Sequence, residues 1–207
     1  MENTISCLYQ FMDSQKDIGA CAPRLLLPDG RIQKSCRELP TFKNLFFEFS
    51  GIKRSVGWKM RHFNYEETRE VEQPMGSCLM IRKKVFDKID GMNERYPIFM
   101  NDVDLCYRIK RAEYKIYFLS EANAVHYLGS STRQVKRKMI LEEHRSMYRY
   151  LRDHFVGQGF SLANLLLTLY GTLLLVGAFY RILFSRCRFN RVIGHSETQL
   201  FSKVGKT

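Results

Sequence analysis

Apolar and polar residues follow one another along the chain in patterns that predict short helices and strands. Apolar residues recur at helical spacing over 4–14, which predicts an amphipathic helix. An apolar run over 20–27 ends at Pro28-Asp29-Gly30, which predicts a strand followed by a tight turn. Strands that alternate with helices indicate an α/β layered fold. The further strands and helices that the pattern predicts lie at 78–81, 83–89, 102–111 and 115–119.

The helix predicted over 102–111 begins with acidic residues just after an apolar run that ends at Met100. Asn101 is a candidate N-cap, and Asp102 and Asp104 fall in the first turn, where the helix dipole favours negative charge. This pattern is typical of a well-capped surface helix. It is also the pattern of a carboxylate held at the mouth of a cleft by a rigid helix start. The residues at helical spacing that we expect to face a core are Val103, Cys106 and Ile109.

The stretch at 161–180 is apolar, carries no charged residue and is just long enough to span a bilayer. Its small and polar residues fall on one helical face, and basic residues flank both of its ends. A single crossing from the cytosol would export the basic tail, against the positive-inside rule. We therefore expect an interfacial or re-entrant membrane-associated helix here rather than a full span.

Composition limits the class of protein and of partner. The chain has 207 residues, of which 45% are hydrophobic and 13% aromatic, and this excludes a disordered chain. Its net charge of +12 predicts attraction to an anionic partner, such as nucleic acid, an acidic membrane or a phosphorylated substrate. The six cysteines have no zinc-like spacing and are interpreted as reduced thiols of a cytosolic domain, and no signal peptide is visible.

Aromatic and basic residues are interleaved over 41–63. Such a stretch can serve as a platform for nucleic acid. It can equally be a loosely structured connection whose aromatic rings pack on the sheet. We favour the connection, because no RNP-like pattern organises these residues.

Two smaller features complete the pattern. Gly76 stands at the mouth of the strand predicted at 78–81, where a missing side chain lets a ligand or another backbone come close. His126 follows an apolar Ala-Val pair at the end of the last predicted strand. A single histidine in this setting is more often a core or surface residue than a metal ligand.

Taken together, four segments resemble family 2 glycosyltransferases, in the rhamnosyltransferase-like branch that builds bacterial surface polysaccharides. The resemblance runs from about residue 1 to about residue 155. It implies a partial GT-A fold, in which a Rossmann-like mixed sheet is flanked by helices. It also implies a nucleotide-sugar donor, a divalent metal (Mn or Mg) and inversion at the anomeric carbon. The segments that carry it are 74–82, 91–94, 99–108 and 126–131.

The resemblance places the catalytic base at Asp102. An acceptor hydroxyl is a poor nucleophile and needs its proton removed as it attacks. The leaving nucleoside diphosphate needs no protein acid, because a metal ion can neutralise its charge. Asp104 would orient the helix start or an acceptor hydroxyl, and His126 corresponds to the family's histidine near the metal and diphosphate.

The resemblance assigns further residues to the acceptor and to the diphosphate. Gly76, Ser77 and Asn101 would line the acceptor side, although the branch usually has Glu at the position of Asn101. Four basic residues would close over the diphosphate or face anionic lipid. They are Arg133, Lys136, Arg137 and Lys138.

The family's nucleotide-binding half, with its Asp-rich metal motif, should precede Met1 and is missing from this sequence. We therefore expect three segments: an acceptor-side portion of the transferase domain at 1–155, a hydrophobic membrane-associated helix at 156–184 and a basic tail at 185–207. The metal site would be incomplete, and the chain alone would transfer nothing. A separate N-terminal half is an expected partner.

The leading hypothesis is the acceptor-side half of an inverting, metal-dependent glycosyltransferase, held at the cytoplasmic side of the cell membrane and acting on a glycan or lipid-linked acceptor. One alternative is a non-catalytic membrane-associated remnant that binds a glycan or lipid acceptor. A weaker alternative is a basic nucleic-acid-binding protein. We expect no nucleic-acid partner, because the positive charge clusters around the apolar tail.

Overall fold

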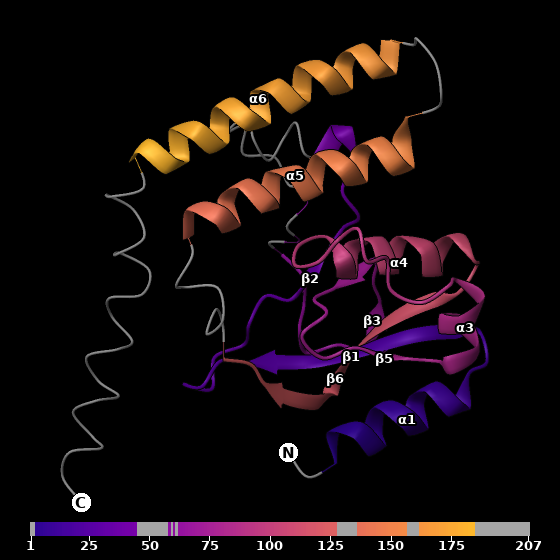
Figure 1. Cartoon of the computed structure of the whole chain (residues 1–207). Coiled ribbons are helices and arrows are strands. Elements are labelled where there is room, and N and C mark those ends of the chain that lie inside the picture. Colours follow the sequence, from indigo (N-terminus) through magenta and orange to yellow (C-terminus); the bar gives the residue numbers. More distant parts are fainter. Residues whose placement is uncertain are drawn as a thin grey trace, which may run out of the picture.

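The computed structural model describes residues 3–44, 58, 60, 62–127, 136–156 and 162–184. A four-stranded mixed sheet in the order β3-β6-β1-β5 forms its centre, with helices on both faces (Figure 1). Its strands are β1 (Ile18–Leu26), β3 (Arg69–Glu70), β5 (Met80–Ile81) and β6 (Lys115–Val125). A separate antiparallel pair consists of β2 (Cys36–Arg37) and β4 (Gln73–Pro74). The described helices are α1 (Thr4–Ser14), α3 (Lys83–Lys88), α4 (Asn101–Arg111), α5 (Lys136–Phe155) and α6 (Leu162–Phe184).

The two long strands, β1 and β6, run parallel at the middle of the sheet, whereas β3 and β5 pair antiparallel at the two sides. The first six residues of β1 are all buried, as a strand covered on both faces requires. The expected α/β architecture, a mixed sheet flanked by helices, is therefore confirmed.

The side chains of β6 alternate between two cores, as its sequence predicts. Ile116 and Phe118 face the core that α4 covers. Leu119 faces the core that α1 covers, where it packs with Leu8 and Met12 of that helix. In Figure 1, α1 lies on one side of the sheet and α4 on the other.

The predicted turn at 28–30 is confirmed. Gly30 adopts a positive φ of 83°, which favours glycine, and the backbone N–H of Leu27 donates to the carbonyl of Arg31 at 2.8 Å. The end of the helix predicted at 83–89 is also confirmed, since the N–H of Gly91 donates to the carbonyl of Phe86 at 2.9 Å.

Two predictions about element boundaries are wrong. The strand expected at 78–81 covers only Met80–Ile81 and is half-buried, because a turn at Gly76 and Ser77 delays its start. Asn101 is the first residue of α4 and not its N-cap. The residue before it, Met100, has a φ of 66°, and the Asn101 side chain accepts a hydrogen bond from the N–H of Asp102 at 2.7 Å.

A pair of long helices covers the outer side of α4. Met147 and Leu151 of α5 pack in one core with Val103 of α4. Helix α6 lies along α5 and is the outermost helix in Figure 1. Leu167 of α6 is buried in the same core, and a Cβ at Gly171 would lie only 2.6 Å from the ring of Tyr148.

The expected C-terminal helix thus forms, but the structure does not support it as a membrane-spanning helix. None of the helices in the described ranges is long and apolar enough to cross a bilayer. The basic tail at 185–207 lies outside the described residues, as does most of the stretch at 41–63. Of that stretch, Phe63 packs edge-on against Phe118 of β6 at a centroid distance of 5.3 Å, as expected for a connection lying on the sheet.

Candidate active site

The carboxylate of Asp102 is held at the start of α4 by backbone and side-chain donors. Its Oδ2 accepts a hydrogen bond from the backbone N–H of Gly76 at 2.9 Å and one from Nε2 of Gln73 at 3.3 Å. Its Oδ1 accepts one from the N–H of Val103 at 2.9 Å. Asp102 is half-buried. These donors fix the direction in which the carboxylate points.

Glycine at position 76 is what allows this arrangement. A Cβ there would lie 2.8 Å from the Cβ of Asp102, closer than side-chain carbons approach one another. The missing side chain therefore lets the backbone of 76 donate directly to the carboxylate. Gly76 and the neighbouring Ser77 are both exposed, so the turn beside Asp102 is accessible from solvent.

Asp104, two residues further along α4, has a different environment. Its side chain is fully buried and accepts from Nε of Arg108 at 2.7 Å, while Nε2 of His154 in α5 lies 2.7 Å from its other oxygen. Burial raises the pKa of the Asp104 carboxyl, but hydrogen bonds from His154 and Arg108 outweigh it and hold the pKa below its ordinary value of 3.8. Of the two roles expected of Asp104, orienting an acceptor hydroxyl does not fit the structure, because both of its oxygens are hydrogen-bonded to protein side chains.

His126 lies directly after β6, and its backbone N–H donates to the carbonyl of Leu26 at 2.8 Å. Its ring Nδ1 lies 2.9 Å from Oε1 of the buried Gln33. A carboxamide oxygen can only accept, so this contact assigns the ring proton to Nδ1. In the neutral form of this ring, the lone pair of Nε2 is left for a ligand.

Asp102 and His126 are connected through the β2–β4 pair. Nε2 of Gln33 donates to the sulfur of Met75 at 3.2 Å, and the N–H of Met75 donates to the carbonyl of Ser35 at 2.9 Å. Met75 immediately precedes Gly76, which donates to Asp102. The structure thus brings Gly76, Asn101 and Asp102 together and links His126 to them through side chains that the sequence did not single out.

The residues described do not form a divalent-metal site by themselves. Within those ranges, no three or more His, Cys, Asp or Glu side chains are grouped so that they could hold a metal ion. His126 offers one nitrogen. The predicted basic residues are not placed at the site: Arg133 and the side chains of Lys136 and Arg137 lie outside the described part, and Lys138 is exposed on α5.

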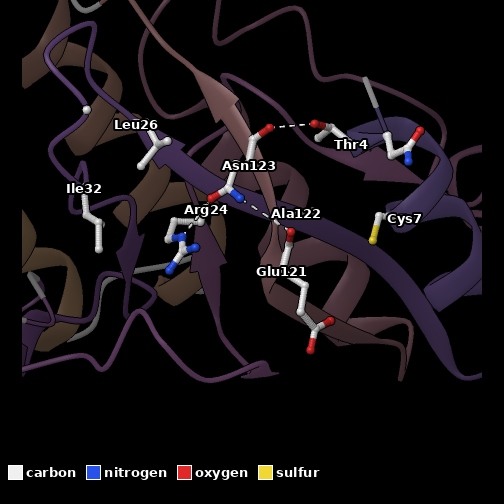
Figure 2. A pocket seen from close by; sticks show the side chains of 10 residues that line it. Thr4, Cys7, Arg24, Leu26, Ile32, Glu121, Ala122 and Asn123 are labelled. Atoms are coloured by element: carbon white, nitrogen blue, oxygen red, sulfur yellow. Dashed lines mark hydrogen bonds between the residues drawn. The ribbon is translucent and has the colours of Figure 1, made fainter. Parts of the chain in front are cut away.

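A separate cavity of about 750 Å³ opens between the start of α1 and the strands β1 and β6 (Figure 2). Arg24 lies in it and donates to Asn123 at 2.8 Å and to Glu66 at 2.7 Å. Thr4 of α1 donates to the carbonyl of Asn123 at 2.6 Å. None of the predicted site residues lines this cavity, so it is not the surroundings of Asp102.

Comparison with known proteins identifies several relatives of the chain. It is 29% identical over 149 residues to an N-acetylglucosaminyl-diphospho-decaprenol L-rhamnosyltransferase of Mycobacterium tuberculosis, covering 67% of this chain and 47% of the relative. It is 25% identical over 118 residues to rhamnosyltransferase WbbL of Escherichia coli K12, covering 56% and 44%. It is 27% identical over 105 residues to the low-salt glycan biosynthesis hexosyltransferase Agl10 of Haloferax volcanii, covering 51% and 32%.

No protein-family model matches the chain. The chain spans about half the length of the mycobacterial and enterobacterial relatives. These relatives are all named as enzymes that transfer rhamnose or a hexose, which confirms the resemblance seen in the sequence motifs. The chain is a homologue of rhamnosyltransferases and glycan hexosyltransferases.

Proposed function

We propose that this chain is the acceptor-side half of an inverting family 2 glycosyltransferase of GT-A fold. It would help to transfer a sugar from a nucleotide-sugar to a glycan or lipid-linked acceptor in cell-surface polysaccharide synthesis. The observation that carries the proposal is the Asp102 carboxylate, held at the exposed turn of Gly76 and Ser77 by a direct backbone hydrogen bond. The name of the mycobacterial relative, which specifies a diphospho-decaprenol acceptor, supports the acceptor class.

The geometry suits Asp102 to the role of general base. A carboxylate oxygen has two lone pairs, and Oδ2 already accepts from Gly76 and Gln73. Among the described residues, Oδ1 accepts only from Val103, which leaves a lone pair for an acceptor hydroxyl. As the hydroxyl oxygen bonds to the anomeric carbon, its proton passes to Oδ1. The sugar–phosphate bond breaks, and its electron pair leaves with the nucleoside diphosphate.

One catalytic carboxylate is enough for this reaction. A glycoside hydrolase needs two carboxyl groups, because it must protonate a poor leaving group as well as activate a nucleophile or water. A nucleoside diphosphate leaves without a protein acid. A divalent metal, when bound, would neutralise the charge on the diphosphate. His126 would supply one ligand through Nε2, and the remaining ligands would come from outside the described residues.

A variant of Asp102 in the native gene tests the proposal with the enzyme as the cell assembles it. Asp102→Asn keeps the size of the side chain and removes its ability to take a proton. We expect the cell-surface glycan, measured by mass spectrometry of its lipid-linked precursors, to stop before the step that this enzyme catalyses. Removing a general base typically slows a reaction by about 100- to 10,000-fold.

Asp13→Asn is the matched control, because Asp13 is an exposed aspartate on α1, on the other side of the sheet from α4. It should leave the glycan unchanged. A normal glycan in the Asp102→Asn strain would contradict the catalytic role. It would favour the alternative of a non-catalytic module that binds a glycan or lipid acceptor.

We propose separately that α6 lies in the surface of a membrane, parallel to its plane, and holds the chain at the cytoplasmic face. The helix is apolar on both sides, since Leu167 and Gly171 face α5 while leucines on the opposite side stay exposed. A helix with large apolar residues on its exposed side as well as on its packed side is typical of a buried or lipid-covered one. Its exposed large side chains are Leu162, Leu165, Leu166, Leu169, Leu173, Leu175, Val176, Phe179 and Tyr180.

Charge favours an anionic lipid surface as the partner of this face. On α5, which packs against α6, Lys138, Arg145 and Arg152 are exposed. The sequence from 181 onward has one acidic residue, Glu197, against a set of basic ones. Anionic lipid attracts such basic segments next to a membrane-bound helix. The basic residues of that segment are Arg181, Arg186, Arg188, Arg191, Lys203 and Lys206.

Co-sedimentation with lipid vesicles tests this placement. The wild-type chain should bind vesicles of phosphatidylcholine mixed with phosphatidylglycerol more tightly than vesicles of phosphatidylcholine alone, and less tightly in high salt. Leu165→Glu, Leu169→Glu and Leu173→Glu together should weaken binding more than about tenfold, because each exposed leucine buried in lipid contributes about 1.5 kcal/mol or more.

Ile5→Glu together with Tyr9→Glu is the control, since these α1 side chains are 73% and 62% exposed and lie on the far side of the sheet. This variant should bind vesicles like the wild type. If the α6 variant binds equally well, or if its only effect is to dissociate a dimer in light scattering, the lipid proposal is contradicted.

A further inference from the structure

Gln73 lies on the short strand β4, next to the proposed base Asp102. Only 2% of this residue is exposed. Its Nε2 donates to the carbonyl of Pro74 at 3.0 Å and to Oδ2 of Asp102 at 3.3 Å. Its Oε1 is buried and has no hydrogen-bond partner among the described residues. A buried amide with one unsatisfied atom costs stability, and an apolar side chain of the same shape would avoid that cost.

Gln33 stands in the same relation to His126. It is 7% exposed, and its Oε1 accepts from Nδ1 of the imidazole at 2.9 Å. The partner of its Nε2 is the sulfur of Met75 at 3.2 Å, a weak acceptor. This glutamine therefore also makes its strongest contact with a residue of the candidate site.

The β2–β4 pair connects the two glutamines. Arg37 pairs with Gln73 and Cys36 with Pro74, and Gln33 lies three residues before β2. Just past β4, Met75 donates its N–H to Ser35 and contacts Gln33 through its sulfur. The β2–β4 pair and its flanking residues thus place one buried glutamine beside Asp102 and another beside His126.

We propose that Gln73 and Gln33 are positioning residues of the active site. Gln73 fixes the orientation of the Asp102 carboxylate, so that Oδ1 faces the acceptor hydroxyl. Gln33 fixes the tautomer of His126, so that Nε2 presents its lone pair to the donor side. The β2–β4 pair holds both groups in register. The catalytic consequence of this inference rests on the proposed function. Its structural consequence, the orientation of the two side chains, does not.

The structural consequence is tested on this chain alone by nuclear magnetic resonance of its histidine rings. In ¹⁵N-labelled protein, the neutral form of the His126 ring should show a protonated Nδ1 and an unprotonated Nε2. The chain has five histidines, and His126→Gln assigns the signal by its disappearance. Gln33→Met keeps the side-chain length and removes the acceptor, and it should convert His126 to the tautomer protonated at Nε2, which is the commoner form of a free imidazole.

Two results would overturn the assignment of Gln33. One is a wild-type His126 that already carries its proton on Nε2. The other is a Gln33→Met ring whose tautomer is unchanged. Gln10→Met, on the exposed side of α1, is the matched control and should leave the His126 signal where it is.

The catalytic consequence is tested with Gln73→Met in the complete native enzyme. Methionine fills the same space without a hydrogen bond, so we expect kcat to fall by about 10- to 100-fold, as for other residues that orient a catalytic group, with KM nearly unchanged. The melting temperature should stay equal or rise, because the unpaired Oε1 is removed.

Asp102→Asn, measured in the same assay, distinguishes a failure of the role of Gln73 from a failure of the proposed function. An inactive Asp102→Asn with a fully active Gln73→Met overturns the role of Gln73 and leaves the proposed function standing. An active Asp102→Asn overturns the proposed function itself. A Gln73→Met enzyme whose activity loss is matched by a lower melting temperature would show a structural role only, which also overturns the inference.

Discussion

At the scale of single residues, two nearby carboxylates of α4 have different environments. Asp102 is directed toward an exposed turn, whereas Asp104 is enclosed by Arg108 and His154. The sequence motif identified both aspartates as site residues, but it did not distinguish their environments. Asp104 and His154 are 50 positions apart in the chain, and no local pattern could have joined them.

Gln73 and Gln33 could not have been found from the sequence for a related reason. Each is a buried polar residue in or near a strand of two residues, too short to show an alternating pattern. Asp102, by contrast, lies in one of the segments that carry the resemblance to family 2 glycosyltransferases, and its prediction as a helix-start carboxylate is confirmed by the position of α4.

Asp104 makes the free energy of unfolding depend on pH in the acidic range. Its pKa is lower in the folded chain than its ordinary value, so its ionised form stabilises the fold. That contribution is complete above the ordinary value of 3.8 and is lost as pH falls through the lower, folded pKa. Urea unfolding from neutral pH down to strongly acidic pH should show the loss.

Asp104→Asn should destabilise the chain by about 3 kcal/mol at neutral pH, because Arg108 and His154 lose a buried partner. The difference from the wild type should shrink as the pH approaches the folded pKa. Asp29→Asn, which breaks an exposed ion pair with Arg31, should have a much smaller effect on the free energy of unfolding. A difference between Asp104→Asn and the wild type that is constant over the whole pH range would contradict this account.

At the scale of elements, long periodic segments were predictable and short ones were not. The helix expected at 4–14 is α1, Thr4–Ser14, because its apolar positions recur over three turns. The strands β2, β3 and β4 have two residues each, so their pairing depends on partners far away in the chain. The start of α4 was misplaced by one residue because Met100 adopts a positive φ, which its sequence does not indicate.

The packing of α6 on α5 depends on Gly171. Any side chain at 171 would meet the ring of Tyr148, so Gly171→Leu should destabilise the chain by about 1–3 kcal/mol in urea unfolding. Gly177 is the control in the same helix, because a Cβ there meets no atom within 4 Å. Gly177→Leu should be neutral or stabilising, as leucine favours a helix more than glycine does. Equal effects at both positions would contradict close α5–α6 packing at 171.

At the scale of the whole molecule, the sheet joins distant parts of the chain into one frame for the site. β1 and β6 pair in parallel, although their first paired residues are Ile18 and Lys115. The class of fold was predictable from the alternation of strands and helices. The strand order was not, since it depends on which edges meet. The chain covers 47% of the length of its mycobacterial relative.

The central claim is that Asp102 takes a proton from the acceptor. The most direct measurement uses the purified, complete native enzyme and compares acceptor binding with sugar transfer for Asp102→Asn. We expect binding of the acceptor to remain within about threefold of the wild type, while transfer falls by at least about 100-fold, because the amide keeps the shape of the carboxylate but cannot act as a base. Transfer at the wild-type rate, with binding intact, would contradict the claim.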